Sequence, residues 1–90
     1  MITIYKYPIQ MKDQFTIEMP YGAQVLSVQT QRETPCIWAL VDSDNWPEKR
    51  PFALRGTGHD CSGLNEARFV GTFQLHGGAL VFHLFDVKAD

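Results

Sequence analysis

The sequence predicts a mainly β fold, in which a single compact antiparallel sheet of six to seven strands curls into a small barrel or sandwich with at most one short helical turn. Short runs rich in β-branched and aromatic residues recur along the chain, and turns containing glycine or proline separate them. No segment keeps the apolar spacing of three and four that marks an amphipathic helix. Because 90 residues are too few for two ordinary domains, residues 1–90 are expected to form one domain around one core.

Three strands are predicted at the start of the chain. Residues 2–7 (ITIYKY) are β-branched and aromatic, and Pro8 then removes a donor from the ladder. Apolar and polar side chains alternate in residues 15–19, which is typical of a half-buried strand, and the turn at residues 20–22 ends it. Residues 24–31 alternate in the same way and form a third strand with one wetter face.

The apolar run at residues 36–41 (CIWALV) predicts the central strand. It contains no polar residue, and such a run between turn signals is typical of a strand covered on both faces. Trp38 is therefore expected in the core, and Cys36 is expected to be a buried free thiol. The polar residues 42–51 form the interval that ends this strand.

Three more strands are predicted in the second half. Residues 52–55 form a short strand, and the glycine-bracketed loop 56–59 follows it. Residues 62–68 are long enough for one helical turn. Residues 69–75 and 80–87 are strand-like, and the segment His-Gly-Gly-Ala between them tolerates the positive φ of a tight hairpin.

Charge and cysteine content exclude several classes of function. Eight basic residues against ten acidic ones give a net charge of −2, which argues against binding duplex nucleic acid through bulk electrostatics. The longest apolar run is too short to span a bilayer, and the first residues do not resemble a signal peptide. Two cysteines make neither a disulfide scaffold nor a zinc site. A soluble cytoplasmic protein without a membrane partner is expected.

The loop from Arg55 to His59 is the first candidate binding site. Gly56 and Gly58 flank Thr57, so the backbone can turn sharply and expose amide donors, while the arginine and histidine add positive or switchable charge. An anionic group such as a phosphate needs this chemistry. The motif matches neither a P-loop nor a dinucleotide fingerprint, and an ordinary turn is the alternative interpretation.

Exposed aromatic side chains are the second candidate. Trp46 lies near Lys49 and Arg50, and its ring could stack on a nucleobase, as could the rings of tyrosines such as Tyr7 or Tyr21. The alternative is that Trp46 folds back and caps the core.

No catalytic centre is predicted, and the chain is not expected to be an enzyme. His59, His76 and His83 are too scattered to indicate a metal site, and a structural role, either hydrogen-bonded or at an exposed edge, is expected for His83. Cys61 lies close to His59 and Asp60 in sequence, but adjacency does not create the geometry of a nucleophile and its base. No metal and no cofactor is expected.

Several motifs resemble a family of short, uncharacterised proteins found in phages and prophages. The likeness covers nearly the whole chain, and its clearest motifs are Tyr5-Lys6-Tyr7-Pro8, Gly56-Thr57-Gly58-His59, Gly71-Thr72-Phe73-Gln74 and Leu80-Val81-Phe82-His83. Small phage proteins of this kind are often counter-defence factors, and one group sequesters the nucleotide messengers of bacterial immune systems. The resemblance implies that the loop from Arg55 to His59 takes the phosphates while Trp46 or a tyrosine stacks on the base. It also implies a homo-oligomer in the cytoplasm of the bacterial host.

Two other classes of function stay open. A protein-binding module would inhibit a host or phage protein through a sheet edge or an exposed apolar patch. A minor virion or assembly component would be found with phage particles.

Overall fold

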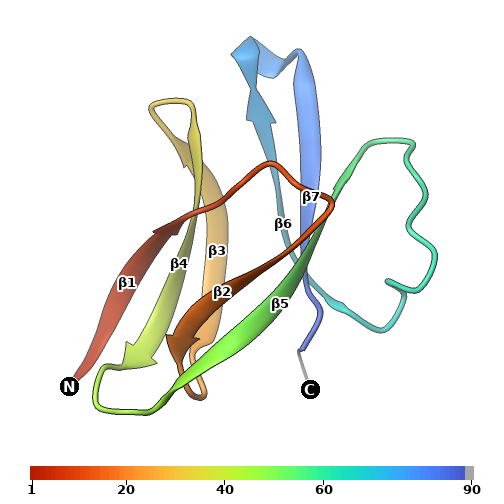
Figure 1. Cartoon of the computed structure of the whole chain (residues 1–90). Helices are drawn as coiled ribbons and strands as arrows, with labels where there is room; N and C mark the ends of the chain where they lie inside the picture. The colour runs from red at the N-terminus through yellow and green to blue at the C-terminus, as the bar shows by residue number, and fades with distance from the viewer. Residues whose placement is uncertain (89–90) are drawn as a thin grey trace.

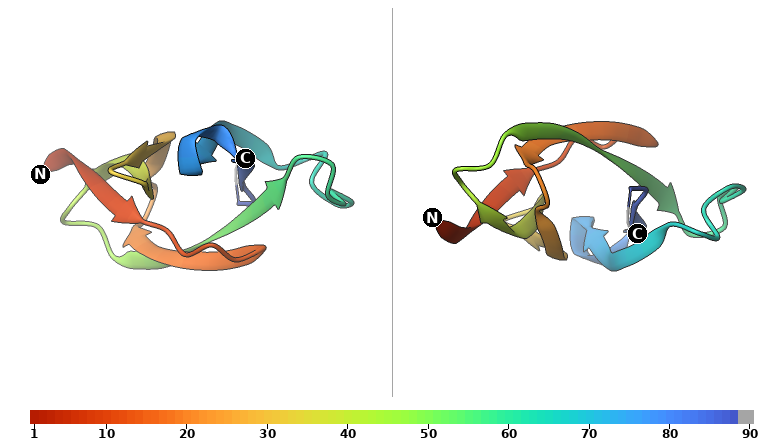
Figure 2. Two further views of the ribbon diagram at one scale, coloured as in Figure 1. Left: turned by 90° about the horizontal axis from the view of Figure 1, so that it is seen from above. Right: turned by 90° about the horizontal axis from the view of Figure 1, so that it is seen from below.

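Two antiparallel sheets form the fold, as a computed structural model of the chain shows for residues 1–88 (Figure 1). The first sheet has three strands in the order β1-β4-β3, and the second has four in the order β2-β5-β7-β6. The mainly β prediction is confirmed, but the single sheet was wrong, because the strands divide into two layers (Figure 2). The elements are β1 (Ile2–Pro8), β2 (Gln14–Pro20), β3 (Gln24–Gln31), β4 (Thr34–Asp42), β5 (Pro47–Gly56), β6 (Arg68–Leu75), the 3-10 turn η1 (His76–Gly78) and β7 (Leu80–Asp86).

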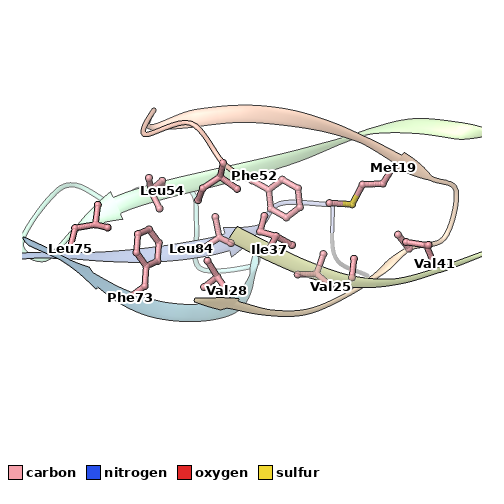
Figure 3. Close-up of a cluster of buried hydrophobic side chains, with 13 residues drawn as sticks. Met19, Val25, Val28, Ile37, Val41, Phe52, Leu54, Phe73, Leu75 and Leu84 are labelled. Atoms are coloured by element: carbon pink, nitrogen blue, oxygen red, sulfur yellow. The ribbon is translucent and has the colours of Figure 1, made fainter. Parts of the chain in front are cut away.

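The core lies between the two sheets and is filled mainly by inward-facing residues of strands β2 to β7, with Tyr7 of β1 packed against it (Figure 3). Successive side chains of a strand point to opposite faces, so a strand that contributes every second residue keeps its other face outside. Phe52 and Leu54 from β5 meet Leu84 from β7, and Ile37 from β4 lies opposite them. The remaining buried apolar side chains of the cluster are Ile9, Met19, Ala23, Val25, Val28, Ala39, Val41, Phe73 and Leu75.

The two sheets meet along a seam between β3 and β6. A Cβ placed on Gly71 would lie 3.0 Å from Cγ1 of Val28, so the two strands approach closely there. Arg68 crosses the seam and donates from Nη1 to the carbonyl of Val25 at 3.1 Å. The seam therefore covers one edge of each sheet, whereas β1 and β2 each pair with a strand on one side only within residues 1–88.

Three local predictions were wrong. The polar interval at residues 42–51 is largely strand, because β5 begins at Pro47 and pairs with β2. Residues 62–67 form turns and no helix, Arg68 already belongs to β6, and the one short helical segment in the described part of the chain is η1, in the β6–β7 hairpin. Trp38 is half-buried instead of lying in the core, because β4 is central in its sheet but is covered on one face only.

Other predictions are confirmed. Cys36 is buried and free, and the His-Gly-Gly-Ala segment makes the hairpin with both Gly77 and Gly78 at positive φ. Within residues 1–88 the structure contains no helix of the length and apolar character that a membrane crossing requires.

Candidate functional site

The glycine loop forms a tight turn at the end of β5. The N–H of His59 donates to the carbonyl of Gly56 at 3.1 Å, and Gly58 has a φ of 86°. This is the arrangement of a type II turn, in which the third residue needs a positive φ and is therefore usually glycine. Gly56 has a different role, because a Cβ there would come within 2.9 Å of the His59 ring. The turn thus explains the positive φ of Gly58, whereas Gly56 lies where the exposed His59 ring folds against the backbone.

Arg55 is bound to backbone carbonyls. Its Nε donates to the carbonyl of Asp60 at 3.0 Å, and its Nη1 donates to the carbonyls of Asp13 at 2.6 Å and Leu54 at 3.0 Å. These bonds tie the loop after β5 to the connection between β1 and β2. The guanidinium therefore has a structural role, although it lies beside the loop where the sequence suggested an anion site.

His83 links the same loop to β6. Its Nε2 is 2.8 Å from Oγ1 of Thr57, and its Nδ1 is 2.8 Å from Oγ1 of Thr72. A hydroxyl can donate or accept, so both ring nitrogens are satisfied in either tautomer. The prediction of a hydrogen-bonded structural His83 is confirmed, and it accounts for Thr57 as well.

Trp46 and the glycine loop lie at opposite ends of β5. Trp46 is 86% exposed in the turn that precedes the strand, and the loop begins where the strand ends (Figure 1). At about 3.3 Å for each residue, ten residues of strand separate them by about 30 Å. The structure therefore leaves Trp46 free of the core but does not bring it to the Arg55–His59 loop.

Arg50 is buried at the centre of an ion cluster instead of lying beside Trp46. Its Nη2 is 2.8 Å from Oδ2 of Asp86, and its Nη1 donates to the carbonyl of Ala23 at 2.6 Å. Oε1 of Glu48 lies 3.6 Å from the same Nη1. Glu48 also accepts a hydrogen bond from Lys88, and this bond lowers the pKa of its carboxyl below the usual value. The cluster joins β5, β7 and the residue before β3. The Arg50 guanidinium is bound to these partners within the fold.

Tyr7 faces the interior and packs against the core. Burial is the main cause that raises the pKa of its hydroxyl, with a smaller contribution from Tyr5. The eight residues predicted to bind a ligand therefore fall into separate places: the loop from Arg55 to His59, the turn at Trp46, the buried Arg50 and the inward-facing Tyr7.

The free edge of β1 is a site that the sequence did not locate. In an antiparallel ladder, residues that bond to one neighbouring strand alternate with residues whose N–H and C=O point to the other side. The N–H of Ser43 donates to the carbonyl of Met1 at 2.9 Å, and the N–H of Ile9 donates to that of Pro35 at 3.0 Å, so the odd-numbered residues of β1 face β4. The peptide groups of Ile2, Ile4 and Lys6 therefore point to the free side.

An apolar patch adjoins this edge on the outer face of the sheet. Ile2 is 65% exposed and Ile4 is 54% exposed, and the register places Ile4 beside Leu40 and Lys6 beside Trp38 on β4. Trp38 and Leu40 are only half-buried. We call these four apolar residues (Ile2, Ile4, Trp38 and Leu40) the outer patch. Exposed, contiguous apolar surface of this kind marks interaction sites.

The free edge of β2 has a different character. Leu54 N–H donates to Asp13 C=O at 2.8 Å and Tyr21 N–H donates to Trp46 C=O at 2.6 Å, so Gln14, Thr16 and Glu18 present their peptide groups to the free side. These side chains are polar or charged and exposed. Of the two open edges, β1 alone combines free peptide groups with exposed apolar side chains.

A family model described as "Domain of unknown function (DUF7352)" matches residues 1–90. The chain belongs to this family. A search of curated proteins found no match to this DUF7352 chain. A search of solved structures found none either. The expectation that the chain belongs to an uncharacterised family over nearly its whole length is confirmed.

The sequence analysis did not locate the β1 edge or the ion cluster, and the reason is the same for both. Both depend on which strands pair, and the partners lie far apart in the chain: Arg50 and Asp86 are 36 residues apart. The composition of β1 is the sequence feature that could have indicated a binding edge. Its only charged residue is Lys6, and edge strands usually carry more charged residues.

Proposed function

We propose that the chain is a protein-binding module that adds an extended segment of a partner protein to the β1 edge. The proposal rests on two properties of this edge: its peptide groups are unpaired, and apolar side chains are exposed beside them. Ile2, Ile4 and Lys6 direct unpaired N–H and C=O groups away from β4, and the two isoleucine side chains are more than half exposed. In this mode of recognition the main chain supplies affinity and alternate side chains supply specificity.

The lack of protection at β1 supports a binding role. Proteins usually blunt an open edge with charged side chains, proline, a bulge or a covering loop, because an open edge pairs with other chains. Within residues 1–88, β1 pairs with β4 over its whole length without a bulge, carries one charge at Lys6, and meets a proline only at Pro8, where the strand ends. An unprotected edge makes a protein prone to aggregate. A binding function would explain why this edge is nevertheless left open.

The chemistry of the edge defines the partner. An antiparallel or parallel strand laid beside β1 would place every second side chain next to Ile2 and Ile4, which favours apolar or β-branched residues there. An acidic residue near Lys6 would form an opposite-charge cross-strand pair. We therefore propose an extended partner segment with alternating apolar residues and an acidic end.

The biological setting is proposed from the motif resemblance. We propose a phage or prophage origin and a role in the cytoplasm of the bacterial host, where the module inhibits a host or phage protein without catalysing a reaction. Sequestration of a nucleotide messenger is a weaker proposal, because Trp46 lies at the other end of β5 from the Arg55–His59 loop. That function needs a pocket completed by a second copy. A minor virion or assembly role is also compatible with a sheet edge that pairs with other proteins.

Selection from a random peptide library tests the proposed function with a defined probe. We expect enriched peptides of about eight residues that alternate apolar and polar residues and bind the full chain with micromolar dissociation constants. Ile4→Pro should abolish binding, because proline removes the N–H that faces the free edge and leaves the hydrogen bonds to β4 in place. Isothermal titration calorimetry measures both.

Thr16→Pro is the matched control, because it makes the same backbone change at the free edge of β2. It should leave peptide binding unchanged. If the selected peptides bind Ile4→Pro as tightly as they bind the unaltered chain, the β1 edge is not the site.

A further inference from the structure

We propose that the β1 edge also binds a second copy of this chain, through antiparallel pairing of the two β1 strands about a two-fold axis at Ile4. The inference rests on the proposed function, because it assigns to the same edge a competing occupant that regulates access to it. In the resulting dimer, two three-stranded sheets join into one of six strands. The outer patches of the two copies then lie next to each other on one face.

The hydrogen-bonding pattern is compatible with this register. In an antiparallel pair, closely bonded partners must both direct their peptide groups toward each other. Pairing about Ile4 joins Ile4 to Ile4 and Ile2 to Lys6 of the second copy. The N–H and C=O groups of Ile2, Ile4 and Lys6 in each strand then find partners, and the C=O of Pro8 stays free at the end of the strand.

Neighbouring registers are less favourable than the one about Ile4. An axis at Tyr5 places Ile2 opposite Pro8, which has no N–H to donate, so the C=O of Ile2 stays unpaired, and it brings the two Lys6 residues to diagonal positions about 7 Å apart. An axis at Thr3 places Lys6 opposite a position before the strand begins. The register about Ile4 therefore pairs every free N–H group of the edge and also keeps the two Lys6 residues apart.

The position of Lys6 decides between the registers about Ile4 and Tyr5. Lys6 is the only charged residue of β1, and it lies opposite Ile2 of the second copy instead of opposite its own counterpart. Four residues of strand separate the two Lys6 positions by about 13 Å, which exceeds the Debye length of about 8 Å at physiological salt. Repulsion between the two ammonium groups is therefore weak.

The small size of the contact makes the dimer a reversible one. Stable complexes bury about 1,200–2,000 Å² in total, and two paired strands of seven residues with their adjoining side chains fall at or below the lower end of this range. We expect a dissociation constant in the micromolar range. The dimer then protects the apolar edge at high concentration and opens when a partner strand competes for it.

Sedimentation equilibrium of the full chain from about 5 to 500 µM tests the inference. The unaltered chain should associate to a dimer over this range, Ile4→Pro should stay monomeric, and Thr16→Pro should associate like the unaltered chain. Circular dichroism establishes that both proline variants are folded. Concentration-dependent amide protection at Ile4 in the unaltered chain provides a second measurement that needs no variant.

A pair of variants at one position tests the register. Ile2→Glu and Ile2→Lys lose the same apolar side chain but place opposite charges beside Lys6 of the second copy. Two cross-strand pairs form in each dimer, so we expect Ile2→Glu to dimerise roughly tenfold more tightly than Ile2→Lys. The nearby Asp42 affects the monomer and the dimer of each variant alike, so its effect cancels.

The outcomes separate the inference from the proposed function. A chain that stays monomeric at 500 µM but binds the selected peptides overturns the inference and leaves the proposed function standing. A dimer that Ile4→Pro does not weaken, or equal dimerisation of the two Ile2 variants, also overturns the inference. If the library yields no peptide that binds the β1 edge, the proposed function fails, whether or not the chain dimerises.

Discussion

The guanidinium of Arg50 holds together three parts of the chain that are distant in sequence. It bonds to Asp86 in β7 and to the carbonyl of Ala23 before β3, while its own backbone lies in β5. Asp86 is only 1% exposed and Arg50 only 6% exposed, so neither charge can be solvated if the other is removed. A buried pair of this kind stabilises little relative to an apolar pair, but breaking it leaves an uncompensated charge.

Arg50→Ala should therefore lower the free energy of unfolding by about 3–5 kcal/mol, because the carboxylate of Asp86 loses its partner. Urea denaturation followed by circular dichroism measures the change. Lys88→Ala is the matched control at the rim of the same cluster, where the lysine side chain is 43% exposed. Its cost should stay below about 1 kcal/mol. Equal losses for the two variants would contradict the structural role assigned to Arg50.

For single residues, the predictions from sequence were correct where the neighbouring residues in the chain determine the environment of the side chain. Cys36 lies inside an apolar run and is buried as predicted, and His83 has the structural role expected from its place on a strand. These predictions did not foresee the surroundings of Arg50, because no pattern near residue 50 indicates that Asp86 and Ala23 come to it. For the same reason Arg50 was predicted beside an exposed ligand site.

At the scale of elements, the contact between β3 and β6 closes the sandwich on one side. Gly71 follows a β-bulge in the register between β6 and β7, and it lets β6 approach Val28. Val28 is buried and β-branched, so its side chain has few alternative rotamers with which to make room. Arg68 adds its hydrogen bond to Val25 at the same seam.

Gly71→Ala should destabilise the fold by roughly 1–3 kcal/mol, because the added methyl group meets Cγ1 of Val28 in a packed region. Thermal unfolding measures this cost. In a Val28→Ala background the obstructing methyl is absent, and the same glycine substitution should cost much less. A cost that is identical in both backgrounds would show that the seam is not as close as the structure places it.

Strand positions were largely predictable, but their extent and pairing were not. Alternation and apolar runs correctly located all seven strands. The start of β5 was missed because Pro47, Glu48 and Lys49 have low strand propensity, and pairing with β2 overrides it. A sandwich was one of the two predicted forms, but the division into two separate sheets was not foreseen, because local patterns do not state which edges meet. Trp38 was predicted to lie in the core because it belongs to an apolar run. The strand that this run forms has one face exposed to solvent, and Trp38 lies on that face.

At the scale of the whole molecule, the fold is thin and has two open edges. Its extents are 39 × 31 × 16 Å, and the smallest dimension fits two sheets packed about 10 Å apart with one layer of side chains between them. A domain this small buries a modest share of its surface. An occupant on the β1 edge would extend the sheet and place its own side chains beside Ile2 and Ile4, so binding and stability are expected to increase together.

Amide hydrogen exchange at the two open edges tests the central claim most directly. In the dilute free protein, the N–H groups of Ile4 and Lys6 should exchange freely, while that of Tyr5, which faces β4, is protected. Adding a peptide selected from the library should slow exchange at Ile4 and Lys6 by at least about tenfold and leave Thr16 on the β2 edge unchanged. Protection that appears at Thr16 instead, or at neither edge while the peptide is bound, would contradict the assignment of β1 as the binding edge.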